Sequence, residues 1–390
     1  MSSPSLQPIL DECRVAIEDK RFTRVRNWKA ERPGRKVMGY FPVFAPRELV
    51  EGAGALPLGL HGGGQQVELM FADSRIQSFV CSISRTTLEL GLIGNLDLLD
   101  GMFFTNICDV ARNLSGVWSR NFPAQKTVFL HLPMHPPGDT SLRYLTKELD
   151  RVYAQVSGMV GNGHSREELR RAIEAGNRNR VLQSKLEAIH RTEPWKLSLP
   201  AIVQLRRIGT QLTLGQHNAM LGDALERLKS SGARPRDGIR VVVEGAFCEQ
   251  PPLELLEVLE ESGCFVVGDD FARGLRPESA PIVLEDGADP IEALARWYVF
   301  SSGTLSVRHA TPQRREDYLF GNLRTCSAQG VIFLNAKFCE PALYDYVVFK
   351  NALERVGGVP FLTLEFEEKQ STFENLRMQV ETFVESILFA

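Results

Sequence analysis

The chain has 390 residues, which is enough for two or more domains that each bury a core of their own. Its hydrophobic fraction of 43% and charged fraction of 24% are typical of soluble globular proteins. The formal net charge of −3 argues against nucleic acid or an anionic membrane as the main partner, and no stretch reaches the roughly 18–20 consecutive apolar residues of a membrane span.

The first 140 residues predict a helical arm (1–32) followed by an α/β lobe (33–140). The arm is expected to be one amphipathic helix over 8–30, ended by Arg32-Pro33-Gly34. In the lobe, apolar strand-like runs alternate with helix-like ones. Strands are expected at 37–41, 56–60, 102–105 and 126–132 and in the run that leads into Cys81, with helices at 46–53, at 84–92 and after Cys108.

The rest of the chain predicts a helical bridge (141–234) and a second α/β lobe (235–390). The bridge carries helix-spaced apolar residues at 141–160, 165–189 and 209–230 and no strand signal. The second lobe again alternates strands and helices, and its strands are apolar throughout, which favours parallel sheets covered on both faces. Its strands are expected at 239–243, 264–267, 331–334 and 360–364, and its helices at 252–262, 290–301, 312–329, 341–356 and from 371. The predicted fold class is therefore α/β, with two doubly wound parallel-sheet lobes joined by a helical segment and a cleft between them.

Three of the seven cysteines, Cys81, Cys108 and Cys339, stand where a strand-like run turns into a helix-like one. A thiolate at the carboxyl end of a strand faces the crevice in which α/β proteins bind ligands, and the N–H groups of a helix N-terminus stabilise it. By contrast, Cys248 lies in a loop-like segment, and the remaining three cysteines are predicted on helix faces or strands. Since no Cys-x-x-Cys pair is present, the spacing alone favours three unrelated buried cysteines over a metal site. Their common position at strand ends makes the two alternatives about equally open.

Four motifs carry a resemblance to a known family. An opening segment, GYFPVFAPRELVEGAGALPLGL, is followed by one motif around each of the three cysteines: CSISRTTLEL, NICDVARNL and AKFCEPALYDYVVFKNALERVGGVPFLTLEFE. In this order they resemble the benzoyl-CoA reductase and 2-hydroxyacyl-CoA dehydratase family, from about residue 37 to the C-terminus. Residues 243–271 are most similar to the gamma subunit of the ATP-dependent benzoyl-CoA reductases, one branch of that family.

The resemblance implies a site. In such proteins each of two related subunits holds a [4Fe–4S] cluster through three cysteines, and the acyl-CoA lies near the clusters. The implied ligands here are Cys81, Cys108 and Cys339, with the cluster in the inter-lobe cleft and one iron left open by this chain. Tyr40 and Phe41, at the start of the opening motif, and Arg85, one helical turn after Cys81, are candidates to bind the acyl substrate.

The resemblance also implies a function: an iron–sulfur subunit of an ATP-dependent benzoyl-CoA reductase that passes low-potential electrons from ferredoxin to an aromatic acyl-CoA and dearomatises its ring. Partners would be a homologous cluster-bearing subunit and ATP-hydrolysing activator subunits, because this chain has no Gly-x-x-x-x-Gly-Lys-Ser/Thr phosphate loop. A subunit of a 2-hydroxyacyl-CoA dehydratase is the nearest alternative, and a non-catalytic two-lobed binding protein is another. The first 25 residues contain no signal-peptide core, which predicts a cytoplasmic protein.

Overall fold

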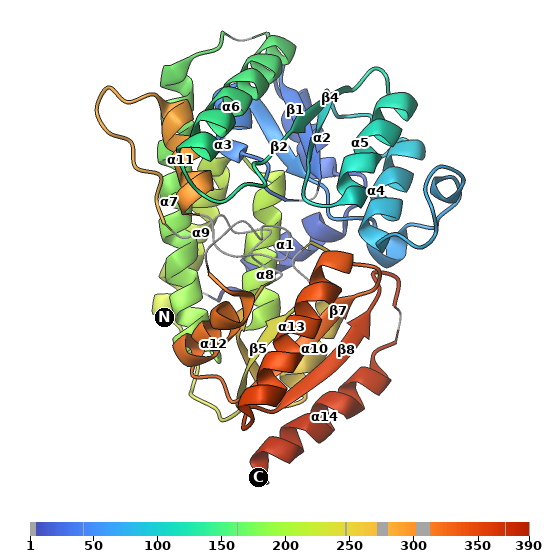
Figure 1. Ribbon diagram of the computed structural model, residues 1–390, viewed down its shortest axis with the longest axis vertical. Coiled ribbons are helices and arrows are strands. Elements are labelled where there is room, and N and C mark those ends of the chain that lie inside the picture. Colours follow the sequence, from blue (N-terminus) through green and yellow to red (C-terminus); the bar gives the residue numbers. More distant parts are fainter. Residues whose placement is uncertain are drawn as a thin grey trace.

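The structure is a computed structural model that describes residues 5–41, 43–161, 163–245, 248–270, 280–301, 313–370 and 372–389 (Figure 1). Two four-stranded parallel sheets, one per lobe, confirm the predicted α/β class. Almost every residue of the central strands is buried, as expected for sheets covered on both faces. No helix among the described residues combines the length and the apolar character needed to cross a bilayer.

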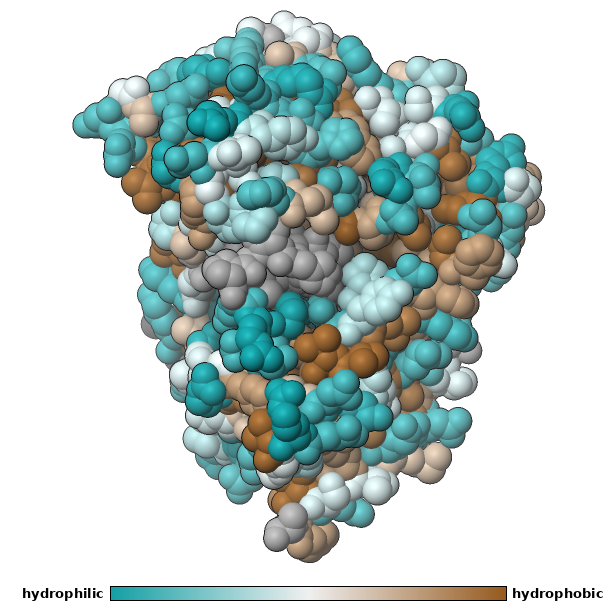
Figure 2. Space-filling view, viewed as in Figure 1, coloured by the Kyte–Doolittle hydropathy of each residue, from teal (hydrophilic) through white to brown (hydrophobic). Residues whose placement is uncertain are grey.

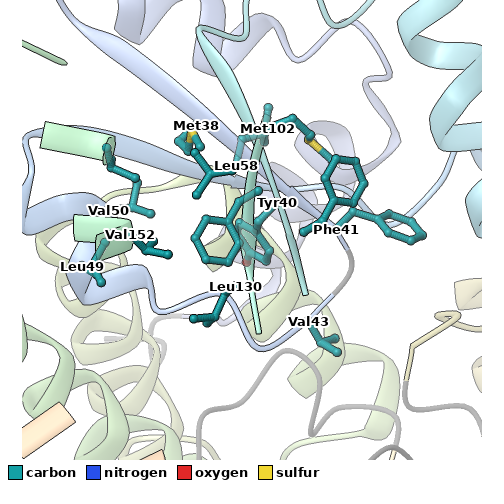
Figure 3. Packing of buried hydrophobic residues seen from close by; sticks show 14 of the residues in the cluster. Met38, Tyr40, Phe41, Val43, Leu49, Val50, Leu58, Met102, Leu130 and Val152 are labelled. Atoms are coloured by element: carbon teal, nitrogen blue, oxygen red, sulfur yellow. The ribbon is translucent and has the colours of Figure 1, made fainter. Parts of the chain in front are cut away.

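The first sheet has the strand order β2-β1-β3-β4. Its strands are β1 (Lys36–Phe41), β2 (Ala55–Gly59), β3 (Gly101–Thr105) and β4 (Lys126–Leu130), and its helices are α3 (Arg47–Gly52), α4 (Ser82–Leu92) and α5 (Asp109–Asn121). Figure 3 shows how apolar side chains of these elements, among them Met38, Tyr40 and Phe41 of β1 and Leu130 of β4, pack into one core.

The second sheet repeats this order as β6-β5-β7-β8. Its strands are β5 (Ile239–Glu244), β6 (Cys264–Asp269), β7 (Gly330–Ala336) and β8 (Phe361–Phe366), and its helices are α10 (Leu253–Glu261), α12 (Arg315–Cys326), α13 (Glu340–Val356) and α14 (Glu374–Leu388). In both sheets the direction of strand addition reverses next to the first strand, between β1 and β3 and between β5 and β7. Open parallel sheets bind ligands outside the carboxyl ends of the strands at such a reversal.

The segment between the sheets is helical, as predicted, but two details were wrong. Its helices are α6 (Asp139–Val160), α7 (Arg166–Thr192), α8 (Leu199–Arg207) and α9 (Leu214–Lys229). The sequence analysis missed α8 and began the last helix at Gly209, where the structure has a 3₁₀ turn (Ile208–Gln211). The capping box of Thr213 and Gln216 starts α9 instead. Helix α11 (Pro290–Phe300), although it follows β6 in the chain, packs against α6 and α7 beside the first core.

The predicted single N-terminal helix is two helices, α1 (Gln7–Glu18) and α2 (Thr23–Ala30). The chain turns between them because Phe22 adopts a left-handed conformation with φ of 54° and the Asp19 carboxylate accepts the N–H groups of Arg21 and Thr23. The two helices serve different cores. Apolar residues of α1 pack in the core of the second lobe, and Val25 of α2 packs in that of the first.

A buried histidine connects three helices of the middle segment. His217 of α9 contacts the Leu205 carbonyl of α8 through Nε2 (2.9 Å) and the Asn179 side-chain amide of α7 through Nδ1 (3.0 Å). Burial, and the charge of Arg47 after it, lower the pKa of His217 to about 3. The imidazole is therefore neutral in the folded protein at any moderately acidic pH.

This buried imidazole should make the protein sensitive to acid. In the unfolded chain the histidine takes up a proton below about pH 6.5, whereas the folded chain does not, so the stability it provides is lost as the pH falls. Replacing it by His217→Gln removes this titration. We expect the free energy of unfolding of the wild type, relative to the variant, to fall by about 2 kcal/mol between pH 7 and pH 5. Chemical denaturation of both proteins measures this, and a difference independent of pH would contradict it.

Candidate functional site

The three motif cysteines occupy one kind of structural position: each is the N-cap residue of a helix. Cys81 precedes α4, Cys108 precedes α5 and Cys339 precedes α13. Cys108 also follows β3, and Cys339 follows β7, which are equivalent strands of the two sheets. The Sγ of Cys108 accepts the Ala111 N–H at 3.4 Å. Free N–H groups at a helix N-terminus stabilise negative charge. A thiolate at any of the three positions is therefore more stable than it would be at an equally buried position without a helix N-terminus.

The prediction that Cys81 ends a strand was wrong. The segment before it contains two 3₁₀ turns (Gly64–Gln66 and Ala72–Ser74) and no strand among its described residues. The buried Glu89 of α4 fixes this segment, because its carboxylate accepts the N–H groups of Phe71 and Ala72. Hydrogen bonds from backbone N–H groups to the Glu89 side chain of α4 thus take the place of the strand pairing that the apolar run suggested.

The fold brings these cysteines, which are far apart in the sequence, into one electrostatic environment. Burial raises the pKa of Cys81 well above its ordinary value, and the charges of Glu249, Cys339 and Cys108 raise it further. Burial also raises the pKa of Cys339 to about 12. A charge on Cys108 opposes the ionisation of both Cys81 and Cys339 and so raises the pKa of each, which places the three thiols within electrostatic reach of one another.

A fourth cysteine, Cys248, belongs to the same group. Burial raises the pKa of its thiol, followed by the charges of Cys339, Cys108 and Cys81. The sequence analysis set Cys248 apart as a loop residue. Its place directly after β5, beside the strand that leads to Cys339, was the signal that could have included it.

The described residues contain no group of three or more His, Cys, Asp or Glu side chains close enough to hold a single metal ion. An iron–sulfur cluster makes a different demand, because each thiolate binds its own iron and the sulfur atoms stand farther apart.

The other predicted site residues have structural partners. Tyr40 and Phe41 are buried in the first core (Figure 3), where the Phe41 ring lies 6.3 Å from that of Phe104. The Arg85 guanidinium donates to the Asp73 carboxylate through Nε and Nη2 at 2.7–3.0 Å. A role of these three residues in binding acyl substrate remains a prediction.

Buried carboxylates join the lobes beside the cysteines. Glu368, after β8, accepts the Thr86 hydroxyl of α4 (2.7 Å) and the Gly64 N–H (2.6 Å). Glu249, next to Cys248, accepts the hydroxyl of Ser82, the first residue of α4. Burial, then the charge of Glu368, raise the pKa of Glu249 to about 8. Helix α4, which begins at Cys81, is thereby fixed to the second lobe at both its first and second turns.

Substitution of Gly62 provides a test of this contact between the lobes. Gly62 has a φ of 81°, and a Cβ there would overlap the Glu368 carboxylate and lie 2.8 Å from the Thr86 Oγ1. Gly94 has a similar φ of 83° but open space around it, so Gly94→Ala measures the backbone cost alone. We expect Gly62→Ala to lower the free energy of unfolding by about 1–3 kcal/mol more than Gly94→Ala does in chemical denaturation. Equal losses would show that the Glu368 contact is not packed as described.

Comparison with known proteins gives consistent matches along the chain. Residues 42–387 match the family model described as 2-hydroxyglutaryl-CoA dehydratase, D-component. The chain is 36% identical to a benzoyl-CoA reductase subunit of Thauera aromatica, over 98% of this chain and 99% of that protein. It is 28% identical to lactoyl-CoA dehydratase subunit beta of Anaerotignum propionicum (98% and 99% covered) and 26% identical to (R)-phenyllactyl-CoA dehydratase beta subunit of Clostridium sporogenes (92% and 93% covered).

Proposed function

The chain belongs to the 2-hydroxyglutaryl-CoA dehydratase D-component family, and we propose that it is the iron–sulfur subunit of a multi-subunit, ATP-dependent benzoyl-CoA reductase. The family membership agrees with the resemblance found in the four motifs. The reductase proposal is carried by the full-length similarity to a benzoyl-CoA reductase subunit, which is higher than that to the two dehydratase subunits. In this role the chain passes low-potential electrons, supplied by ferredoxin, toward an aromatic acyl-CoA.

The donor set suits a [4Fe–4S] cluster held by Cys81, Cys108 and Cys339. Buried neutral thiols lose their protons when metal binds, so binding and proton release are coupled. The helix N-termini that carry the three residues supply N–H groups toward the sulfurs, which stabilises the thiolates and helps set a reduction potential. A bound cluster would supply one-electron chemistry. The protein's contribution is to hold the thiols in fixed positions at helix ends, with Cys339 buried and Cys81 and Cys108 half-buried.

Several parts of the reaction fall to partners. The sequence has no phosphate-binding loop of the Gly-x-x-x-x-Gly-Lys-Ser/Thr type, so activator subunits would hydrolyse ATP. A homologous cluster-bearing subunit would contribute to the acyl-CoA site. Electron supply by ferredoxin and the use of reduced cysteines both support a cytoplasmic location for the complex.

An apolar surface beside Cys339 supports docking of such a partner. Phe338 precedes the cysteine, and Tyr344, Val347 and Val348 follow on one face of α13; all four are exposed, Tyr344 to 71%. Figure 2 shows apolar side chains gathered over α13 on the face toward the viewer. Contiguous exposed apolar residues are typical of interaction sites.

Iron analysis tests the cluster. Complex purified without oxygen should contain about four irons for each copy of this chain beyond those of its partners. We expect Cys81→Ser, Cys108→Ser and Cys339→Ser each to lose this iron, and Cys13→Ser, whose thiol lies in the core of the second lobe, to keep it. A folded, colourless preparation without iron would overturn the proposal.

Substrate choice separates the reductase from the dehydratase alternative, which the family description and two of the relatives favour. The complete complex is assayed with ATP and a strong reductant on benzoyl-CoA and on 2-hydroxyacyl-CoAs. We expect ATP-dependent loss of the aromatic absorbance of benzoyl-CoA and a rate at least about tenfold lower on the hydroxyacyl substrates, since each 1.4 kcal/mol of transition-state discrimination is worth a factor of ten. Consumption of the hydroxyacyl substrates alone would assign the chain to the dehydratases.

A further inference from the structure

We propose that Cys248 is a fourth protein ligand of the cluster, which closes the iron that Cys81, Cys108 and Cys339 leave open. The inference rests on the proposed function, because it requires the cluster to be present. It changes the role of this chain: a cluster held by four thiolates has no free coordination position and transfers electrons without binding substrate.

The topology of the second sheet places Cys248 at the same edge as Cys339, where the carboxyl ends of the strands lie. The loop after β5 and the loop after β7 leave the carboxyl ends of neighbouring strands, on the two sides of the point where strand addition reverses. Cys248 lies in the first loop and Cys339 in the second. The loop after β5 starts against the end of β7, since a Cβ on Gly245 would lie 2.8 Å from the Asn335 Oδ1 and 3.1 Å from the Leu334 carbonyl oxygen.

A contact between the lobes brings the same loop to Cys81. The Ser82 hydroxyl donates to the Glu249 carboxylate, so the residue after Cys81 is bonded to the residue after Cys248. Cys248 itself packs against the core of the first lobe, as do Cys81 and Cys108. The loop therefore reaches across to the lobe that carries two of the other thiols.

Among the cysteines outside the three motifs, Cys248 is the one that packs against the same core as Cys81 and Cys108. The remaining cysteines have other neighbours. The Cys13 thiol lies 3.8 Å from the Met220 sulfur, Cys264 responds to Glu260, and Cys326 lies at the end of α12.

Four thiolates complete the coordination of a [4Fe–4S] cluster. When the sulfur of Cys248 bonds to iron, its proton leaves to solvent and a solvent ligand is displaced. An iron without a protein ligand is the one that such clusters lose most readily, leaving a [3Fe–4S] form. With Cys248 in place this chain should resist that loss, and the substrate would meet the cluster of the partner subunit instead.

The test uses the anaerobically purified complex. Controlled oxidation with ferricyanide, followed by electron paramagnetic resonance, counts [3Fe–4S] spins per copy of this chain. Compared with the wild type, we expect about one additional spin for Cys248→Ser and none for the matched control Cys326→Ser. Full iron content without an additional spin in Cys248→Ser would overturn the inference.

A second measurement needs no variant. Thiols of the wild-type complex are alkylated under native conditions, before and after removal of iron by a chelator, and mapped by mass spectrometry. We expect Cys248 to gain reactivity on iron removal together with Cys81, while the buried Cys264 does not. Equal reactivity of Cys248 in both states contradicts the inference alone, whereas absence of iron from the starting complex contradicts the proposed function as well.

Discussion

The loops that follow parallel strands all lie at one edge of the sheet, where the carboxyl ends of the strands are. In this chain two such edges are held against each other by buried carboxylates. Glu368 binds Thr86 and Gly64 of the opposite lobe, and Glu249 binds Ser82. The cysteines depend on this junction, because Cys81 and Cys108 belong to the first lobe and Cys339 to the second. Neither lobe alone assembles the site. The geometry of the thiols is therefore a property of the interface and not of either sheet.

Burial at that interface also decides the chemistry of the site. The thiols and Glu249 all have pKa values raised by burial, so this region favours their neutral forms over anions. Cationic iron would reverse this by replacing protons on sulfur. The cost of creating charge in a water-poor space is then offset by metal bonds, and the helix N-termini at Cys81, Cys108 and Cys339 contribute in the same direction.

The sequence predicted those features that local residue patterns determine. Continuous apolar runs identified the strands of both sheets, and Cys81, Cys108 and Cys339 stand at helix starts as expected. The errors of prediction occur where contacts between distant parts of the chain determine the local structure. In the segment before Cys81, Phe71 and Ala72 bind the Glu89 carboxylate and no strand forms among the described residues. The break at Phe22 is hidden because α1 and α2 face different cores. The sequence could not place Cys248 near Cys339, because only the pairing of β5 with β7 reveals which loops are neighbours.

The split N-terminal segment has a consequence for how the protein is made. Helix α1 leaves the ribosome first, yet its apolar face, with Ile9, Cys13 and Ile17, packs in a core built from α8, β5 and β7. That surface stays exposed until α8 and the 3₁₀ turn after it, which it contacts, have been synthesised. Because sequence-distant contacts form late and slowly, the unfinished chain is the stage at which it is most prone to aggregate. Helix α1 thus depends for its burial on a helix from the middle of the chain.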